Sequence, residues 1–148
     1  MIRVHGTSVA LDGDGILFRG PPGSGKSDLA LRLIDAGARL VADDQTELRH
    51  AGDRLMMSAP AAIAGRLEVR GVGIVAVPAI AAAPLRLVVD LVAPERVERL
   101  PEPVFAELLD CRVPLLALAP FEASAPAKLR LALAALRAGA ADAFLAAS

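Results

Sequence analysis

The sequence predicts an α/β fold: a single domain with a mixed β-sheet and flanking helices. Three observations lead to this prediction. A strand-like run ends in a glycine-rich loop that opens a helical pattern, short apolar runs bounded by turn residues fill the middle of the chain, and a second helical pattern follows near its end. The length of 148 residues fits one domain, 1–148, with a sizeable core.

The first third of the chain predicts a hairpin followed by a strand, loop and helix. Alternating apolar residues predict strands at Val4–Leu11 and Ile16–Phe18, joined by the turn residues Asp12–Gly15. After the glycine-rich loop, apolar residues recur at helical spacing between Leu29 and Ile34, and Gly37 provides a stop signal.

The rest of the chain predicts more strands and a second helix. The helix is expected over Lys128–Ala138, where leucines recur on one face, with Pro126 just before it. Short apolar runs predict further strands, with a hairpin turn at Ala51-Gly52-Asp53. These strands are expected at Arg39–Ala42, Thr46–His50, Arg54–Ser58, Leu67–Arg70 and Leu85–Leu91.

Composition excludes several classes of function. With 55% hydrophobic and 22% charged residues the chain is globular, and 16 Lys+Arg against 17 Asp+Glu give no field that would steer it to nucleic acid. Four Phe without Tyr or Trp provide no base-stacking platform for nucleic acid, and proline and glycine break the longest apolar run, so we expect neither nucleic-acid nor membrane partners. The single cysteine, Cys111, predicts a reducing cytoplasm; we assign it no role, and we expect His50 to be a surface residue.

The strongest motif is a full match to the P-loop pattern G-x-x-x-x-G-K-[ST], and it reads Gly20-Pro21-Pro22-Gly23-Ser24-Gly25-Lys26-Ser27. It follows a predicted strand and opens a predicted helix, the context in which backbone N–H groups and the helix N-terminus face phosphates. We expect Lys26 to reach the β- and γ-phosphates of a nucleotide and the Ser27 hydroxyl to bind Mg²⁺.

Phosphoryl transfer at such a loop also needs a carboxylate at a nearby strand end, and Asp43-Asp44 supplies two. Adjacent residues on an extended segment point to opposite sides, so we expect at most one to face the γ-phosphate, and either can be that residue. Asp28 follows the loop directly, where the helix dipole alone favours an acidic residue; we expect a structural role for it.

Three segments together resemble the HPr kinase/phosphorylase family, the bacterial serine kinases of a phosphocarrier protein. They are Val4-His5-Gly6-Thr7, the P-loop followed by Leu40-Val41-Ala42-Asp43-Asp44, and Leu67-Glu68-Val69-Arg70-Gly71-Val72-Gly73-Ile74-Val75. The resemblance is to the catalytic domain and implies the HPr kinase/PEP-carboxykinase-like variant of the P-loop fold. It covers residues 2–93 well and the remainder loosely.

The resemblance implies roles for individual residues. Asp44 would take the proton from the target serine hydroxyl, with Asp43 supporting it, and Glu68 would complete the metal site with Ser27. His5 aligns with the family's histidine near the phosphates, and Arg99 with its later catalytic arginine.

The resemblance also implies ATP and Mg²⁺ as cofactors, an HPr-like phosphocarrier of a bacterial phosphotransferase system as protein partner, and a homo-oligomer, a hexamer in the family.

The sequence departs from the family in two places. Members typically carry an additional amino-terminal domain, so we expect a short form here. The segment Pro120–Lys128, which in the family is rich in arginine and serves removal of phosphate, has Lys128 as its only cation. Because an extra anion would be bound weakly there, we expect a kinase rather than a phosphorylase.

Two alternatives stay open. A small-molecule kinase also pairs a P-loop with an acidic strand end, and it would need arginines from a lid, for which the candidates are Arg96, Arg99, Arg130 and Arg137. A nucleotide-sensing regulatory module would bind the nucleotide without turnover on any acceptor.

Overall fold

The computed structural model describes residues 1–139, which form a mainly β-stranded domain with two α-helices. In chain order the elements are β1 (Ile2–His5), β2 (Thr7–Leu11), β3 (Asp14–Arg19), α1 (Lys26–Asp35), β4 (Arg39–Ala42), β5 (Gln45–Ala51), β6 (Arg54–Ser58), the 3₁₀ turn η1 (Ala61–Ile63), β7 (Arg66–Val69), β8 (Gly73–Ala76), β9 (Ala82–Leu91), the 3₁₀ turn η2 (Pro94–Arg96), β10 (Val104–Leu108), β11 (Cys111–Leu118) and α2 (Ala125–Arg137). Residues 140–148 of the predicted single domain lie outside the described part.

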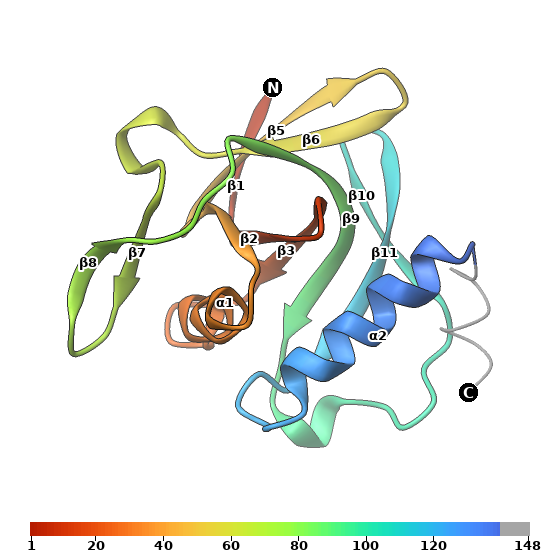
Figure 1. Cartoon of the computed structure of the whole chain (residues 1–148). Helices are drawn as coiled ribbons and strands as arrows, with labels where there is room; N and C mark the ends of the chain where they lie inside the picture. The colour runs from red at the N-terminus through yellow and green to blue at the C-terminus, as the bar shows by residue number, and fades with distance from the viewer. Residues whose placement is uncertain (140–148) are drawn as a thin grey trace.

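Nine of the strands form one mixed sheet. Seven follow the order β1-β5-β6-β9-β3-β2-β4, and the β10–β11 hairpin joins through β11, which pairs with β9. The β3–β9 and β9–β11 pairs are parallel, and the other pairs are antiparallel. The β7–β8 hairpin is a separate sheet that projects beside α1 (Figure 1). The predicted α/β fold with a mixed sheet is confirmed.

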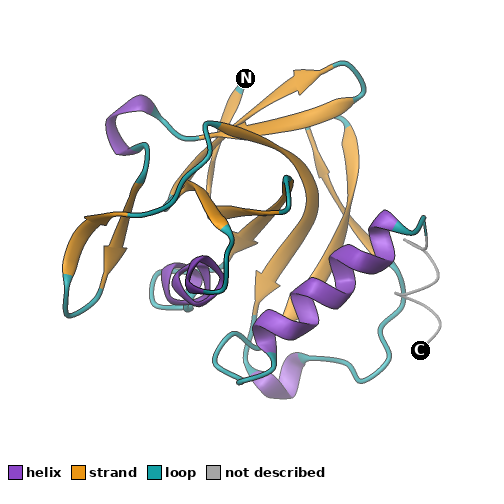
Figure 2. Ribbon diagram, in the orientation of Figure 1, coloured by secondary structure: helices purple, strands orange, loops and turns teal. Residues whose placement is uncertain are grey.

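The sheet is buried on both faces. Both helices cover one face (Figure 2), where Phe18 of β3 packs with the leucines of α1 and α2. Leu17 points the other way into a second core made by strands alone, among them β5, β6, β9 and β11. Because β3 is buried on both sides, the loop that follows it starts from a rigid strand.

Several predicted elements agree with the structure. The β2–β3 hairpin turns at Asp12 and Gly13, both with positive φ, as its Asp-Gly pair predicts. Helix α1 buries the predicted apolar face, and Gly37 follows its end with φ of 109°. The strands expected at Arg39–Ala42 and Arg54–Ser58 have the predicted bounds.

The strand predicted over Val4–Leu11 is wrong, because Gly6 divides it. On one side of Gly6, β1 pairs with β5. On the other side, β2 pairs with β3 and β4. A Cβ on Gly6 would lie 2.8 Å from the carbonyl oxygen of Phe18, so the close passage at this point needs glycine.

Other boundaries also differ. Pro126 lies in the first turn of α2 and not before it, a position where proline's missing N–H costs nothing. The strand expected over Leu67–Arg70 ends at Val69. Strands β8, β10 and β11 were not predicted.

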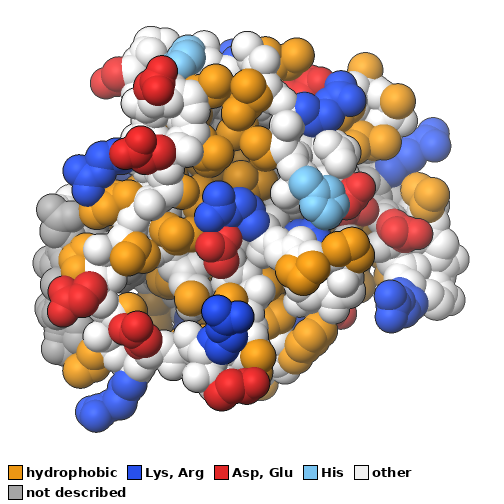
Figure 3. All heavy atoms as spheres, turned by 180° about the vertical axis from the view of Figure 1, so that it is seen from behind, with side chains coloured by type: hydrophobic (Ala, Val, Ile, Leu, Met, Phe, Trp, Pro, Cys, Tyr) orange, Lys and Arg blue, Asp and Glu red, His pale blue; other side chains and the backbone are white. Residues whose placement is uncertain are grey.

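Among the described residues, the two helices are each too short or too polar to cross a lipid bilayer. On the face shown in Figure 3, acidic and basic side chains are interspersed, in keeping with the near-neutral charge of the sequence.

Candidate active site

Two breaks in neighbouring strands face each other and build the site. Gly6 separates β1 from β2, and Asp43-Asp44 separates β4 from β5. Since β1 pairs with β5 and β2 with β4, the breaks fall at the same level, and the Gly6 N–H donates to the Asp44 carbonyl at 2.8 Å. This register brings His5 and Thr7 against the acidic turn.

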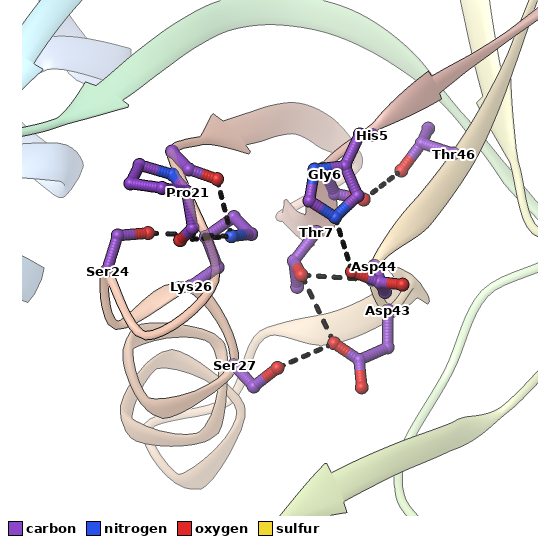
Figure 4. Close-up of polar contacts among 11 residues, drawn as sticks. His5, Gly6, Thr7, Pro21, Ser24, Lys26, Ser27, Asp43, Asp44 and Thr46 are labelled. Carbon is purple, nitrogen blue, oxygen red and sulfur yellow. Dashed lines mark hydrogen bonds and ion pairs between the residues drawn. The ribbon is translucent and has the colours of Figure 1, made fainter.

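His5 and Asp44 form the first contact of the site. The His5 Nε2 lies 2.7 Å from the Asp44 Oδ1, and the two side chains point toward one another in Figure 4. Both are substantially exposed, at 47% and 63%. Asp44 is also on the wall of a cavity that it shares with the glycine-rich loop.

Asp43 is the centre of a hydrogen-bond network. Its Oδ1 accepts from the Ser27 hydroxyl at 2.7 Å and from the Thr7 hydroxyl at 3.1 Å. Its Oδ2 accepts from the backbone N–H of Glu68 at 3.1 Å. Asp43 therefore ties the start of α1 to β2, as Figure 4 shows, and it also ties both to the β7–β8 hairpin through Glu68.

The two aspartates point in different directions, as expected, but for a different reason. The expectation was an extended segment, whereas Asp44 has φ of 68° and lies in a turn. A non-glycine residue in the left-handed region is uncommon, and such residues cluster at functional sites. The turn directs Asp43 toward Ser27 and Asp44 toward His5.

The glycine-rich loop joins β3 to α1, as predicted. Gly23 and Gly25 have φ of 82° and 101°, which only glycine adopts without strain. Gly25 is the N-cap residue of α1 and has no side chain to cap the first-turn amides. The Lys26 ammonium donates to the carbonyls of Gly20 at 2.6 Å and Pro21 at 3.0 Å. Backbone carbonyls of the loop therefore hold the lysine side chain in place.

A cavity of about 780 Å³ brings most of the predicted residues together. Its walls are the glycine-rich loop, the start of α1, Asp44 and the β7–β8 hairpin, where Glu68 is exposed. Arg99 does not line this cavity; it is exposed in the loop between η2 and β10. The cavity therefore brings Lys26, Asp44 and Glu68 to one site and leaves Arg99 outside it. His5 does not line the cavity and joins the site through its contact with Asp44.

Ser27 and Asp43 fit a magnesium site in which most of the ligands are phosphate oxygens and water. Mg²⁺ in such sites takes one or two carboxylates, and the Ser27 hydroxyl already contacts the Asp43 carboxylate. In the described range 1–139, no three His, Cys, Asp or Glu side chains are grouped as a complete metal site. Glu68 reaches Asp43 through its backbone N–H.

Sequence reasoning missed the part played by Thr7. Its side chain is fully buried, donates to Asp43 and accepts from the Asp44 N–H at 3.1 Å. The available signal was its place in the His5-Gly6-Thr7 segment, next to a glycine in an otherwise alternating run.

Three residues without a proposed catalytic role have clear positions, and one of them, Asp28, lines the cavity. Asp28 accepts a hydrogen bond from Arg32 one turn along α1, in keeping with the structural role expected for it. Cys111 and His50, which have no assigned role, lie together, with Sγ 3.9 Å from Nδ1.

The fold and site define a class: mixed α/β proteins in which a loop of the form G-x-x-x-x-G-K-S joins a buried strand to a helix, beside an acidic turn. Within that class, the chain belongs to the HPr Serine kinase C-terminal domain family, whose family model matches residues 1–119. The resemblance seen in the three sequence segments is thereby confirmed.

Individual relatives agree with this assignment. The chain is 49% identical over 76 residues to an HPr kinase/phosphorylase of an Exiguobacterium species, and 47% identical over 78 residues to one from Clostridium tetani. These matches cover 51% and 53% of this chain but only 24% and 26% of the relatives.

A solved structure matches over a greater length. The HPr(Ser) kinase/phosphatase from Coxiella burnetii superposes with a TM-score of 0.83 at 27% identity, covering 94% of this chain and 98% of that chain. The mixed sheet with few helices is therefore the fold of that protein as well.

Proposed function

We propose that the chain is an ATP- and Mg²⁺-dependent serine kinase that phosphorylates an HPr-like phosphocarrier of a bacterial phosphotransferase system, and so regulates carbon or nitrogen metabolism. The observation that carries the proposal is the position of Asp44: its carboxylate contacts His5 and lines the cavity that the glycine-rich loop also lines. Family membership supports the same activity.

In this proposal, the glycine-rich loop binds the triphosphate. The amides at the start of α1 and the Lys26 ammonium face anionic oxygens, which the helix dipole also favours. Lys26 would exchange the carbonyls of Gly20 and Pro21 for phosphate oxygens. The loop fixes the γ-phosphoryl group for in-line attack.

Asp44 acts as the general base. The serine Oγ forms a bond to the γ-phosphorus while the bond from that phosphorus to the bridging oxygen of ADP breaks, and the serine proton passes to the Asp44 carboxylate. His5 contacts the other side of that carboxylate and orients it. A proton acceptor within hydrogen-bond reach of the attacking hydroxyl is what this step requires.

Ser27 and Asp43 are the residues that would hold Mg²⁺, with Glu68 as a further ligand from the cavity wall. When bound, the ion neutralises charge on the phosphate oxygens. Thr7 keeps the Asp43 carboxylate in place by donating to its Oδ1.

The loop after β11 supports kinase over phosphorylase activity. The one basic residue of the segment Pro120–Lys128 is Lys128, in the first turns of α2, and it is paired with Glu122 of the loop at 3.1 Å. Arg32 also reaches this loop, but it donates to the backbone carbonyls of Pro120 and Glu122. These cations are therefore already occupied, and an additional phosphate would find few free donors.

The cytoplasmic location and the ring of subunits belong to the same proposal and rest on the resemblance.

The test is incubation of the chain with Mg²⁺, ATP and an HPr-like carrier, followed by mass spectrometry of the carrier. We expect one phosphoserine, absent when the carrier serine is replaced by alanine. ATP consumption with a small acceptor and none with the carrier would favour the small-molecule kinase. ATP binding without turnover on either would favour the sensor.

A further inference from the structure

A second cavity lies on the other side of the glycine-rich loop. It has a volume of about 540 Å³ and is lined by Pro21 and Ser24 of the loop and by the segments that follow β9 and β11. Because β9 and β11 run parallel to β3, their carboxyl ends open at the same sheet edge as the glycine-rich loop. Ligands of open α/β sheets bind at such an edge.

The two cavities meet at Phe121, which lines both. This side chain is 69% exposed, although it is a large apolar ring. It lies directly over the N-cap of α1: a Cβ on Gly25 would fall 2.9 Å from the Phe121 Cζ. The ring therefore borders the segment that binds phosphate in the proposed function.

The loop that carries Phe121 is held on both sides. Ala119 and Ala125 are buried at 2% and 0% exposure. Arg32 of α1 donates to the carbonyl oxygens of Pro120 and Glu122, the two residues that flank the ring. The backbone that carries the exposed ring is thus anchored to α1.

The topology separates two sides of the glycine-rich loop. In the sheet order, β2 and β4 lie on one side of β3 and lead to the acidic turn, whereas β9 and β11 lie on the other. The first of these sides has Asp44 on its cavity wall. In the proposed function the acceptor serine approaches Asp44 from this side. The opposite side is lined mainly by apolar residues, among them Leu91, Val92 and Pro94.

We propose that Phe121 is a stacking surface for the nucleobase of the nucleotide whose phosphates bind the glycine-rich loop, and that the second cavity holds the nucleoside. The inference rests on the proposed function for the presence of that nucleotide. A planar base stacks well on an exposed aromatic ring, and the apolar walls of the second cavity suit its faces and edges. The phosphate chain runs from Phe121 across Gly25 to Ser27, toward Asp44.

The test compares the binding of two ligands, ATP and inorganic tripolyphosphate, to the 148-residue chain by calorimetry. Phe121→Ala should weaken ATP binding about tenfold, the effect of losing one base–aromatic stack, and leave tripolyphosphate binding unchanged. Leu131→Ala is the matched control, because Leu131 is 71% exposed on α2 and lines neither cavity. ATP binding at wild-type strength in Phe121→Ala would overturn the proposal, and so would an equal loss for both ligands.

Phe121→Trp gives a second readout. The chain has no tryptophan, so the fluorescence of this variant reports on position 121 alone. We expect ATP to quench it and tripolyphosphate to leave it unchanged; equal responses to both would contradict base stacking. Neither experiment measures phosphoryl transfer. A chain that binds ATP through Phe121 but phosphorylates no carrier would refute the kinase proposal and leave this inference standing, whereas a wild-type chain that binds neither ligand would overturn both.

Discussion

The Nε2 atom of His5 lies 2.7 Å from the Oδ1 of Asp44, although the two residues are 39 positions apart in the sequence. The contact exists because the break at Gly6 faces the break at Asp43-Asp44, so that two strand ends meet. Exposed ion pairs contribute little to stability. The effect of this pair is therefore expected on activity more than on folding.

His5→Ala should lower kcat for carrier phosphorylation about tenfold and leave the KM for ATP unchanged, because the histidine orients the base and does not line the cavity proposed for the nucleotide. In a double variant with Asp44→Asn, the second change should add little. His50→Ala is the matched control, since His50 is exposed on β5 away from the cavity. Equal effects of His5→Ala with and without Asp44→Asn would contradict the coupling.

Thr7→Val should destabilise the chain and lower its activity. It removes the hydroxyl that bonds Asp43 and the Asp44 N–H, and a buried polar group left unpaired costs about 1–3 kcal/mol. Denaturant unfolding measures the loss, and Thr7→Ser should restore both stability and rate. Wild-type stability and rate in Thr7→Val would show that the hydroxyl does not hold the turn.

Ser27→Ala should raise the Mg²⁺ concentration needed for half-maximal transfer by about tenfold or more, because it removes a hydroxyl from the proposed metal site. A magnesium titration at saturating ATP measures the shift. Ser27→Thr keeps the hydroxyl and should behave as wild type. An unchanged magnesium requirement in Ser27→Ala would place the ion elsewhere.

The parts of the fold that local sequence signals specify were predicted. The β2–β3 turn has Asp12-Gly13, the pair that favours positive φ at both turn positions. The β10–β11 hairpin makes its two-residue turn with Leu109 and Asp110, at φ of 47° and 64°, and neither is glycine. Pro114 inside β11 also argues against a strand. That hairpin was therefore missed.

In the site, too, the sequence predicts what a local pattern specifies and misses contacts between distant segments. The glycine-rich loop is contiguous in sequence, so its residues and the helix after it were predicted. The contacts of Thr7 with Asp43 and Asp44 depend on the register between β2 and β4, which no local pattern reports. Phe121 was missed for a similar reason: only the parallel placement of β11 brings its loop to Gly25.

In the proposed reaction, Asp44 accepts the serine proton during transfer from ATP. The most direct measurement is single-turnover transfer of label from γ-labelled ATP to an HPr-like carrier, with ATP binding measured in parallel. Asp44→Asn should keep ATP affinity within about twofold of wild type and lose transfer by about 10²–10⁴-fold, the range for a general base. Asp53→Asn, in the β5–β6 turn, makes the same charge change away from the site and should transfer normally. Transfer by Asp44→Asn at the wild-type rate would show that Asp44 is not the general base.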